Sequence, residues 1–271
     1  TSELTVIGET PKRETGTMLR FWPDAKYFDS ARFSLSRLKQ LLRAKAVLCP
    51  GLKVSFFDET TQERLVWQYE NGLSSYLLEA VGEAHCLPQE SFTGRFSSKT
   101  EAAEWAVVWL PEGEEGVSES YVNLIPTAQG GTHVNGLRTG LSEALREFCE
   151  LRNLLPRGLK LSPDDVWEQC RYVLSVKIKE PQFSGQTKER LSSRECAAFV
   201  SGVVKDSFSL WLHQNVSEAE AIARLVLDNA QRRLRLSKKI ERKKISGGPA
   251  LPGKLADCTV ANSLQGELFL V

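Results

Sequence analysis

The chain has 271 residues, of which 41% are hydrophobic and 25% charged, and its formal net charge is +1. This is the composition of a folded globular protein long enough for two compact domains, which excludes a wholly disordered chain. With so little net charge, any attraction to a polyanion must come from local clusters of basic residues.

The chain also lacks the signs of export, of membrane insertion and of a metal site. Its apolar stretches, such as 105–110 and 268–271, are far shorter than the roughly 20 residues that cross a bilayer, and residues 1–15 are polar. Six cysteines without a close pair predict reduced thiols, and the three histidines have no partners at ligand spacing. We expect a cytoplasmic protein. The missing initiator Met and the apolar end predict a piece of a longer chain.

The first third of the chain predicts a small α/β unit. Ser34 can cap a helix whose leucines recur at helical spacing, and a polar turn at 58–63 separates two strands. We expect this unit to end near Gly82. Its predicted elements are a strand, a helix, two strands and a short helix, at 17–21, 35–49, 53–57, 64–69 and 73–81.

A second sheet is predicted after Gly82, with strands at 92–96, 103–110 and 120–125. The two strands on either side of 111–116 predict an antiparallel hairpin. Residues 105–110 are apolar at both odd and even positions, which predicts a central strand covered on both faces. A helix at 135–153 should pack on this sheet.

The last part is predicted to be mainly helical. Ser162, followed by a proline and two aspartates, is a strong helix start. Residues 172–178 alternate in polarity, which predicts a strand with one wet face running into a loop. Helices are expected at 192–214 and from 217 through the basic stretch 232–244.

The loop at 185–188 is the most informative motif. Gly185 gives the backbone freedom, Gln186 can donate hydrogen bonds and Lys188 is a mobile charge suited to a terminal phosphate. Taken alone, the motif favours a solvated surface turn over a phosphate contact. A surrounding set of motifs resembles the B subunits of bacterial type II DNA topoisomerases: VKIKEPQFSGQTK at 176–188, GTMLRFWP at 16–23, NLIP at 123–126, GGTHVN at 130–135 and LPGKLADC at 251–258.

The resemblance covers essentially the whole chain, and the topoisomerase IV branch fits better than the gyrase branch at 44–51 and 209–215. It implies an α/β (α+β) chain in three parts. Residues 1–82 would be the carboxyl-terminal part of a GHKL ATPase module, and 83–245 a transducer domain resembling ribosomal protein S5 domain 2, with a long basic helix at its end. Residues 246–271 would be a linker and the first strand of a TOPRIM domain.

The resemblance also implies site residues. Gln186 and Lys188 would touch the γ-phosphate of ATP, and Thr17 would line the adenine side of the pocket, unless it is an ordinary strand threonine. Arg138 would face the DNA cavity of the dimer or lie solvated on its helix. The basic helix would steer DNA or serve as a solvated connector, and its candidate contacts are Arg232, Arg233, Arg235, Lys238 and Lys239.

The implied function is ATP-coupled DNA strand passage, with relaxation and decatenation of DNA, by the full-length enzyme. That enzyme would use ATP and Mg²⁺, form a heterotetramer with an A subunit, and dimerise through its B subunits on ATP binding. This chain alone should neither hydrolyse ATP nor bind it tightly, because the catalytic Glu, the Mg-binding Asn and the lid would lie upstream. No catalytic set and no metal site is expected within it.

Three other interpretations stay open on the sequence. One is a non-enzymatic nucleic-acid-binding module, since S5-like folds and basic helices also occur in RNA-binding proteins. Another is the gyrase branch of the same family, which shares most of these motifs. A third, a chaperone or mismatch-repair ATPase with the same two-domain plan, is disfavoured by residues 251–258.

Overall fold

The computed structural model describes residues 16–244, with gaps at 31, 71 and 114–115, together with residues 5, 8, 9 and 11. For residues 237–244 it describes the helical backbone alone. The expected TOPRIM strand and the motif at 251–258 lie outside the described residues. No helix within the described part is long and apolar enough to cross a membrane.

The amino-terminal part consists of helix α1 (Leu35–Leu48) and an antiparallel hairpin of β1 (Val54–Asp58) and β2 (Glu63–Trp67). Asp58 shapes the turn of the hairpin: its carboxylate accepts hydrogen bonds from the Thr60 amide at 2.8 Å and the Thr61 hydroxyl at 2.9 Å, and these bonds lower its pKa. The predicted hairpin is confirmed.

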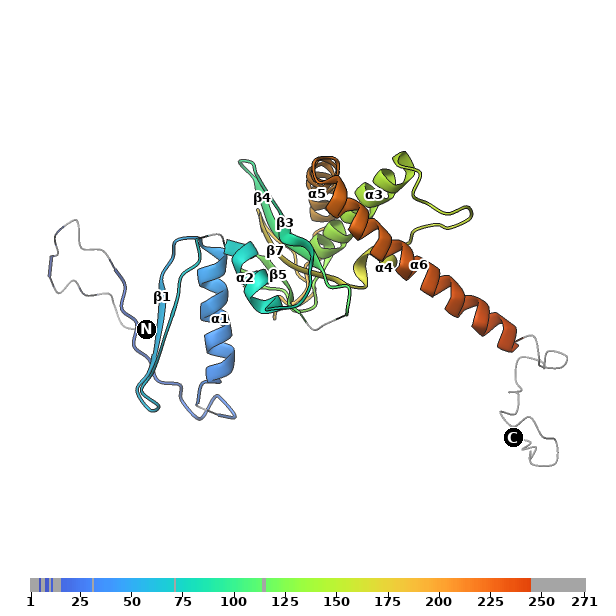
Figure 1. Cartoon of the computed structure of the whole chain (residues 1–271). Coiled ribbons are helices and arrows are strands. Elements are labelled where there is room, and N and C mark those ends of the chain that lie inside the picture. The colour runs from blue at the N-terminus through green and yellow to red at the C-terminus, as the bar shows by residue number, and fades with distance from the viewer. Residues whose placement is uncertain are drawn as a thin grey trace, which may run out of the picture.

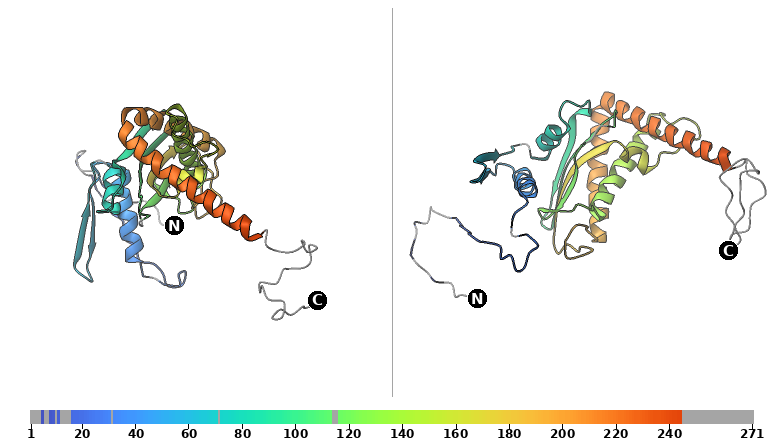
Figure 2. Two further views of the ribbon diagram at one scale, coloured as in Figure 1. Left: turned by 45° about the vertical axis from the view of Figure 1, so that its right-hand side comes forward. Right: turned by 90° about the horizontal axis from the view of Figure 1, so that it is seen from below.

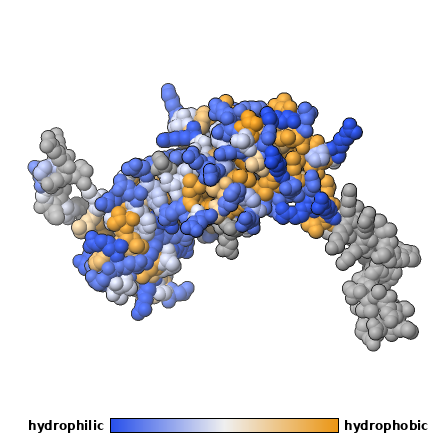
Figure 3. Space-filling view, in the orientation of Figure 1, coloured by the Kyte–Doolittle hydropathy of each residue, from blue (hydrophilic) through white to orange (hydrophobic). Residues whose placement is uncertain are grey.

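The predicted strand at 17–21 is wrong. Residues 16–24 have no regular structure, and Met18 is 96% exposed. A strand needs a neighbour for its backbone hydrogen bonds, and none of the described strands pairs with this segment. The amino-terminal part of the molecule shows hydrophobic surface in Figure 3, and Phe57 and Val66 of its hairpin are exposed.

The second part contains a five-stranded sheet in the order β3-β4-β7-β5-β6. Its strands are β3 (Leu87–Ser97), β4 (Glu101–Trp109), β5 (Ser118–Val122), β6 (Ile125–Pro126) and β7 (Cys170–Ile178). β4 pairs antiparallel with β3 and with β7, whereas β5 runs parallel to β7. The predicted hairpin between the second and third strands is therefore wrong, because β7 lies between β4 and β5.

The central position of β4 is confirmed. Trp105, Val107 and Trp109 are buried on one face, and Ala106 and Val108 on the other. The predicted wet face of β7 is wrong: Val173 and Ser175 are buried as well. Helix α2 (Gly72–Val81) and the end of α1 pack against the face on which Val173 lies. Local alternation cannot show a covering that comes from distant helices.

Two long helices cover the opposite face of the sheet, α3 (Thr132–Leu151) and α5 (Arg194–Gln214) (Figures 1 and 2). They approach at two glycines of α3. A Cβ atom added at Gly136 would lie 2.6 Å from the Ala197 carbonyl oxygen, and one at Gly140 would lie 2.7 Å from that of Ser201. α3 and α5 therefore meet backbone to backbone.

The short helix α4 (Pro163–Trp167) precedes β7, and α6 (Val216–Lys244) follows α5. The predicted cap of α4 is confirmed, because Ser162 and Asp165 form a complete capping box. The basic stretch continues α6 as predicted. Beyond α4 this helix runs away from the rest of the molecule, as Figures 1 and 2 show.

Candidate functional site

The segment between β7 and α5 forms a stalk that carries the Gly185–Lys188 turn at its tip. Phe183 and Leu191 form an antiparallel bridge. Two further backbone bonds close the stalk, Ser184 N to Arg190 O at 2.9 Å and Ser192 N to Gln182 O at 2.8 Å. At the tip the Lys188 amide donates to the Gly185 carbonyl at 3.2 Å, and Lys188 has a φ of 57°. The backbone of the loop is thus fixed up to its turn.

The stalk also docks on the turn that begins α3. The Leu191 amide donates to the Gly130 carbonyl at 3.0 Å, and the Thr132 amide donates to the Leu191 carbonyl at 3.1 Å. Gly131 has a φ of 136°, and a Cβ atom there would lie 2.3 Å from the Leu191 carbonyl oxygen. Only glycine fits such an approach, so the paired glycines make room for the stalk.

The side chains of Gln186 and Lys188 are both exposed at this tip. Among the described residues, no hydrogen bond or ion pair engages either side chain, so both are available to an external acceptor. Thr17 is exposed too, but no contact in the described part joins it to the loop. Gln186 and Lys188 therefore share one exposed turn, whereas Thr17 lies in the irregular segment 16–24.

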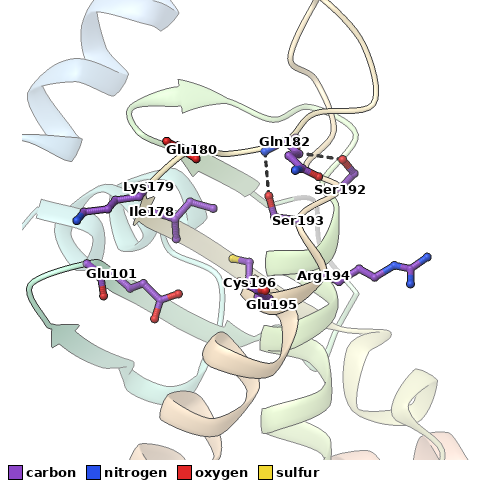
Figure 4. A pocket seen from close by; sticks show the side chains of 11 residues that line it. Glu101, Ile178, Lys179, Glu180, Gln182, Ser192, Ser193, Arg194, Glu195 and Cys196 are labelled. Carbon is purple, nitrogen blue, oxygen red and sulfur yellow. Dashed lines mark hydrogen bonds between the residues drawn. The ribbon is translucent and has the colours of Figure 1, made fainter.

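A cavity of about 630 Å³ lies beside the base of the stalk, between the start of β4, the end of β7 and the start of α5 (Figure 4). The Gln182 amide donates to the Ser193 hydroxyl at 2.9 Å, and the Ser192 hydroxyl donates to the Gln182 carbonyl at 3.1 Å. The charged residues that line the cavity carry both signs, namely Glu101, Lys179, Glu180, Arg194 and Glu195. Such a lining has no net preference for an anion. Sequence reasoning missed this cavity because its walls come from three separate segments.

His133, beside the paired glycines, is a buried structural residue. Its Nε2 lies 3.0 Å from the Thr127 hydroxyl, and that hydroxyl donates to the Ser120 carbonyl at 2.9 Å. Burial lowers the pKa of His133 to about 4, so the ring is neutral at physiological pH. This environment agrees with the prediction of a turn-stabilising side chain.

Arg138 extends from α3 and forms an ion pair with Asp164 of α4. Its Nε atom is buried and has no hydrogen-bond partner among the described residues. The predicted cavity arginine is therefore neither freely solvated nor fully exposed, because a carboxylate of the same chain holds its guanidinium group.

Some basic residues of α6 are also engaged by carboxylates of the same chain. Arg233 forms two hydrogen bonds with the Asp165 carboxylate, and Arg232 lies 3.5 Å from a Glu168 oxygen. Arg235 is exposed. The side chains of Lys238 and Lys239 lie outside the described residues. Two of the five candidate DNA contacts are thus engaged within the chain.

The cysteines and acids of the described part form no disulfide and no metal-binding cluster. Cys49, Cys86, Cys149, Cys170 and Cys196 are free thiols, and burial raises the pKa of Cys149 to about 11. No group of three His, Cys, Asp or Glu residues within the described segments is placed to hold a metal ion.

The chain is similar to known proteins along its whole length. The family model of DNA gyrase B matches residues 72–242. The chain is 65% identical over 270 residues to the DNA topoisomerase 4 B subunit of Pseudomonas aeruginosa, and 61% identical over 269 residues to that of Escherichia coli. It is 34% identical to the DNA gyrase B subunit of Helicobacter pylori. The match covers 100% of this chain for the Pseudomonas protein and 99% for the Escherichia protein, but 43% of either relative's length.

Two solved structures share the fold. The ATP-binding domain of topoisomerase IV from Francisella tularensis, in complex with a small-molecule inhibitor, is 40% identical with a TM-score of 0.69, covering 79% of this chain and 58% of that one. The 43K ATPase domain of Thermus thermophilus gyrase B, in complex with an aminocoumarin, is 28% identical with a TM-score of 0.69, covering 81% and 59%.

Proposed function

Because this chain belongs to the DNA gyrase B family, we propose that it is part of a topoisomerase IV B subunit and that it couples ATP turnover to DNA strand passage. Its higher identity with topoisomerase IV relatives than with the gyrase relative favours the topoisomerase IV branch. The full-length protein would be an ATP-hydrolysing type II isomerase that relaxes and decatenates DNA.

The observation that carries the proposal is the exposed pair of donors on a fixed stalk. Gln186 and Lys188 lie at the end of a backbone tied to both the sheet and the start of α3. An amide and an ammonium group at this position can bind the oxygens of a terminal phosphate. The contact exists only while that phosphate is attached, so hydrolysis removes the interaction that favours one domain orientation.

The remaining roles follow from the same proposal. Residues 1–82 complete an ATPase module whose Mg²⁺ ligands and catalytic glutamate belong to upstream chain, and Thr17 lines the adenine side. Residues 83–245 form the transducer domain, and 246–271 lead into a TOPRIM domain. Partners would be DNA, the topoisomerase IV A subunit, and a second copy of the full-length chain in the ATP-bound state, in the cytoplasm.

The two units proposed here share helix α2. It contacts both α1 and the five-stranded sheet, and the family model begins at residue 72, the first residue of this helix. The proposal keeps the boundary near residue 82, and helix α2 contacts both units.

The test is Lys188→Ala in the full-length protein assembled with its A subunit. We expect ATP hydrolysis to fall by about 100-fold or more, because one charge-assisted contact in a closed site contributes about 3 kcal/mol. Circular dichroism and thermal unfolding should match the unsubstituted protein. Lys99→Ala, an exposed lysine in the β3–β4 turn, is the matched control and should hydrolyse ATP normally. Near-normal turnover by Lys188→Ala would rule out the phosphate contact.

A further inference from the structure

Helix α4 has only five residues, yet it holds a buried charge. Asp165 is 2% exposed, and its carboxylate accepts the Ser162 amide at 2.7 Å as part of the capping box. The guanidinium of Arg233 completes the set, with Nε to Oδ1 at 2.7 Å and Nη2 to Oδ2 at 2.9 Å. A buried carboxylate needs such a partner, and the two-point geometry fixes the angle at which arginine approaches.

A second residue of α6 contacts the same helix one turn earlier. Asn229 is 1% exposed, and its amide donates to the Asp165 carbonyl and to the Gln169 side chain, both at 3.0 Å. Since positions four apart lie on one face of a helix, Asn229 and Arg233 present a single polar stripe to α4. Two successive turns of α6 are thus held to one short helix.

α4 is in turn fixed to the core of the sheet. The indole Nε1 of Trp109, on the central strand β4, donates to the Val166 carbonyl at 2.7 Å. On its other side, Asp164 pairs with Arg138 of α3. The adjacent aspartates therefore connect α4 to two long helices, one through an exposed pair and the other through a partly buried pair.

The apolar contacts between α6 and its neighbours constrain the direction of α6 less than these hydrogen bonds do. Ala230 and Leu227 pack against Leu159 in a small separate cluster, with Leu234 at its edge. Beyond Leu234 the helix leaves the protein, with Arg235 and Leu236 exposed and the backbone helical to Lys244. The ten residues from 235 to 244 rise by about 15 Å, so a small rotation at the junction moves the far end by several ångströms.

We propose that Asp165, Asn229 and Arg233 form a clamp that sets the direction in which α6 leaves the transducer domain, with Arg233 as a positioning residue for the coupling of ATP turnover to strand passage. This inference rests on the proposed function. Apolar side chains hold α6 in place, whereas the clamp selects one orientation among those that the apolar contacts permit. A change at the nucleotide loop then reaches the end of α6 as a defined displacement, because the loop docks on α3 and α3 holds α4.

The experiment uses the full-length protein with its A subunit and compares Arg233→Met with the double variant Asp165→Asn, Arg233→Met. The double variant removes both charges, which avoids leaving a buried carboxylate unpaired. Arg224→Met is the matched control, since Arg224 is an exposed arginine of α6 with a weak pair to Glu220 at 3.8 Å. ATP hydrolysis and DNA relaxation are measured together, and spin labels on unnatural amino acids at positions 139 and 242 report the distance from α3 to the end of α6.

We expect the double variant to hydrolyse ATP within about twofold of the unsubstituted enzyme while the number of ATP molecules consumed per relaxation event rises by about tenfold. The distribution of the 139–242 distance should broaden, and Arg224→Met should change neither quantity. Unchanged coupling, or a narrow unchanged distance distribution in a folded double variant, would overturn the clamp. Failure of the unsubstituted enzyme to relax DNA with ATP would instead overturn the proposed function.

Discussion

The five-stranded sheet buries its large side chains, whereas the amino-terminal segment before it leaves them exposed. Trp109 on β4 is fully buried, stacks on Phe208 and donates its indole hydrogen to Val166. Trp22 is 72% exposed and has Arg20 over its ring at 4.8 Å. The sheet is covered by helices on both faces, whereas the large apolar side chains of residues 16–30, among them Met18 and Phe28, are exposed. We therefore expect the contacts of the sheet, and not those of the amino-terminal segment, to determine the free energy of unfolding.

The largest expected effect separates these two tryptophans. Trp109→Ala should lower the free energy of unfolding by about 3–5 kcal/mol, because it opens a cavity and leaves the Val166 carbonyl without its donor. Trp22→Ala should change it by less than about 0.5 kcal/mol. Urea unfolding followed by circular dichroism measures both. Equal effects of the two changes would show that the amino-terminal segment is packed as tightly as the sheet.

A second pair of variants sharpens the contrast within the helical layer. Gly140→Ala should destabilise the chain by about 2–3 kcal/mol, because the new methyl group would lie 2.7 Å from the Ser201 carbonyl of α5. Gly202→Ala on α5 meets no atom within 4 Å and should stabilise the helix by about 0.5–1 kcal/mol. Midpoints of urea unfolding give both values. A stabilising Gly140→Ala would mean that α3 and α5 separate easily.

The smallest expected effect is a dependence on pH. The pKa of His133 is about 4 in the folded chain and 6.5 in the reference state, so on acidification the unfolded chain binds the proton first. The stabilisation from neutral His133 is complete above about pH 6.5 and is lost as the pH falls toward 4. When the pH falls from 7 to 5, the free energy of unfolding of His133→Gln should decrease by about 2 kcal/mol less than that of the unsubstituted chain.

The control for this prediction is His85→Gln, which changes an exposed histidine between the two parts of the chain. Its unfolding free energy should follow the unsubstituted chain at each pH. If His133→Gln also follows it, the ring of His133 is accessible to protons in the folded state, and the burial of the glycine turn is less complete than the structure indicates.

Much of the fold could be predicted from local patterns, and the errors have one physical origin. The cap of α4, the hairpin β1–β2 and the central strand β4 depend on residues close together in sequence. The wet face of β7 and the hairpin of β4 with β5 were wrong because both depend on which distant element lies next to a strand. Register and covering are decided by tertiary packing.

In the candidate site, too, local features could be predicted from the sequence and contacts between distant residues could not. Gln186 and Lys188 form a local motif, and the structure leaves both side chains exposed as that motif requires. The engagement of Arg138 and Arg233 by the adjacent aspartates of α4 joins residues 26 and 68 positions apart. A basic side chain carries no local sign of its partner, so no sequence pattern distinguished these arginines from Arg235.

The strand order has a consequence for how the chain is made. β7 is the last of the five strands to leave the ribosome, yet it occupies the middle of the sheet between β4 and β5. Until residue 178 has been synthesised, β4 offers one unpaired edge along its most apolar stretch, and β5 has only the two-residue strand β6 beside it. Open edges of this kind recruit other chains. A polypeptide stopped before Cys170 should therefore aggregate, and chaperones that bind extended apolar segments should recognise β4 during translation.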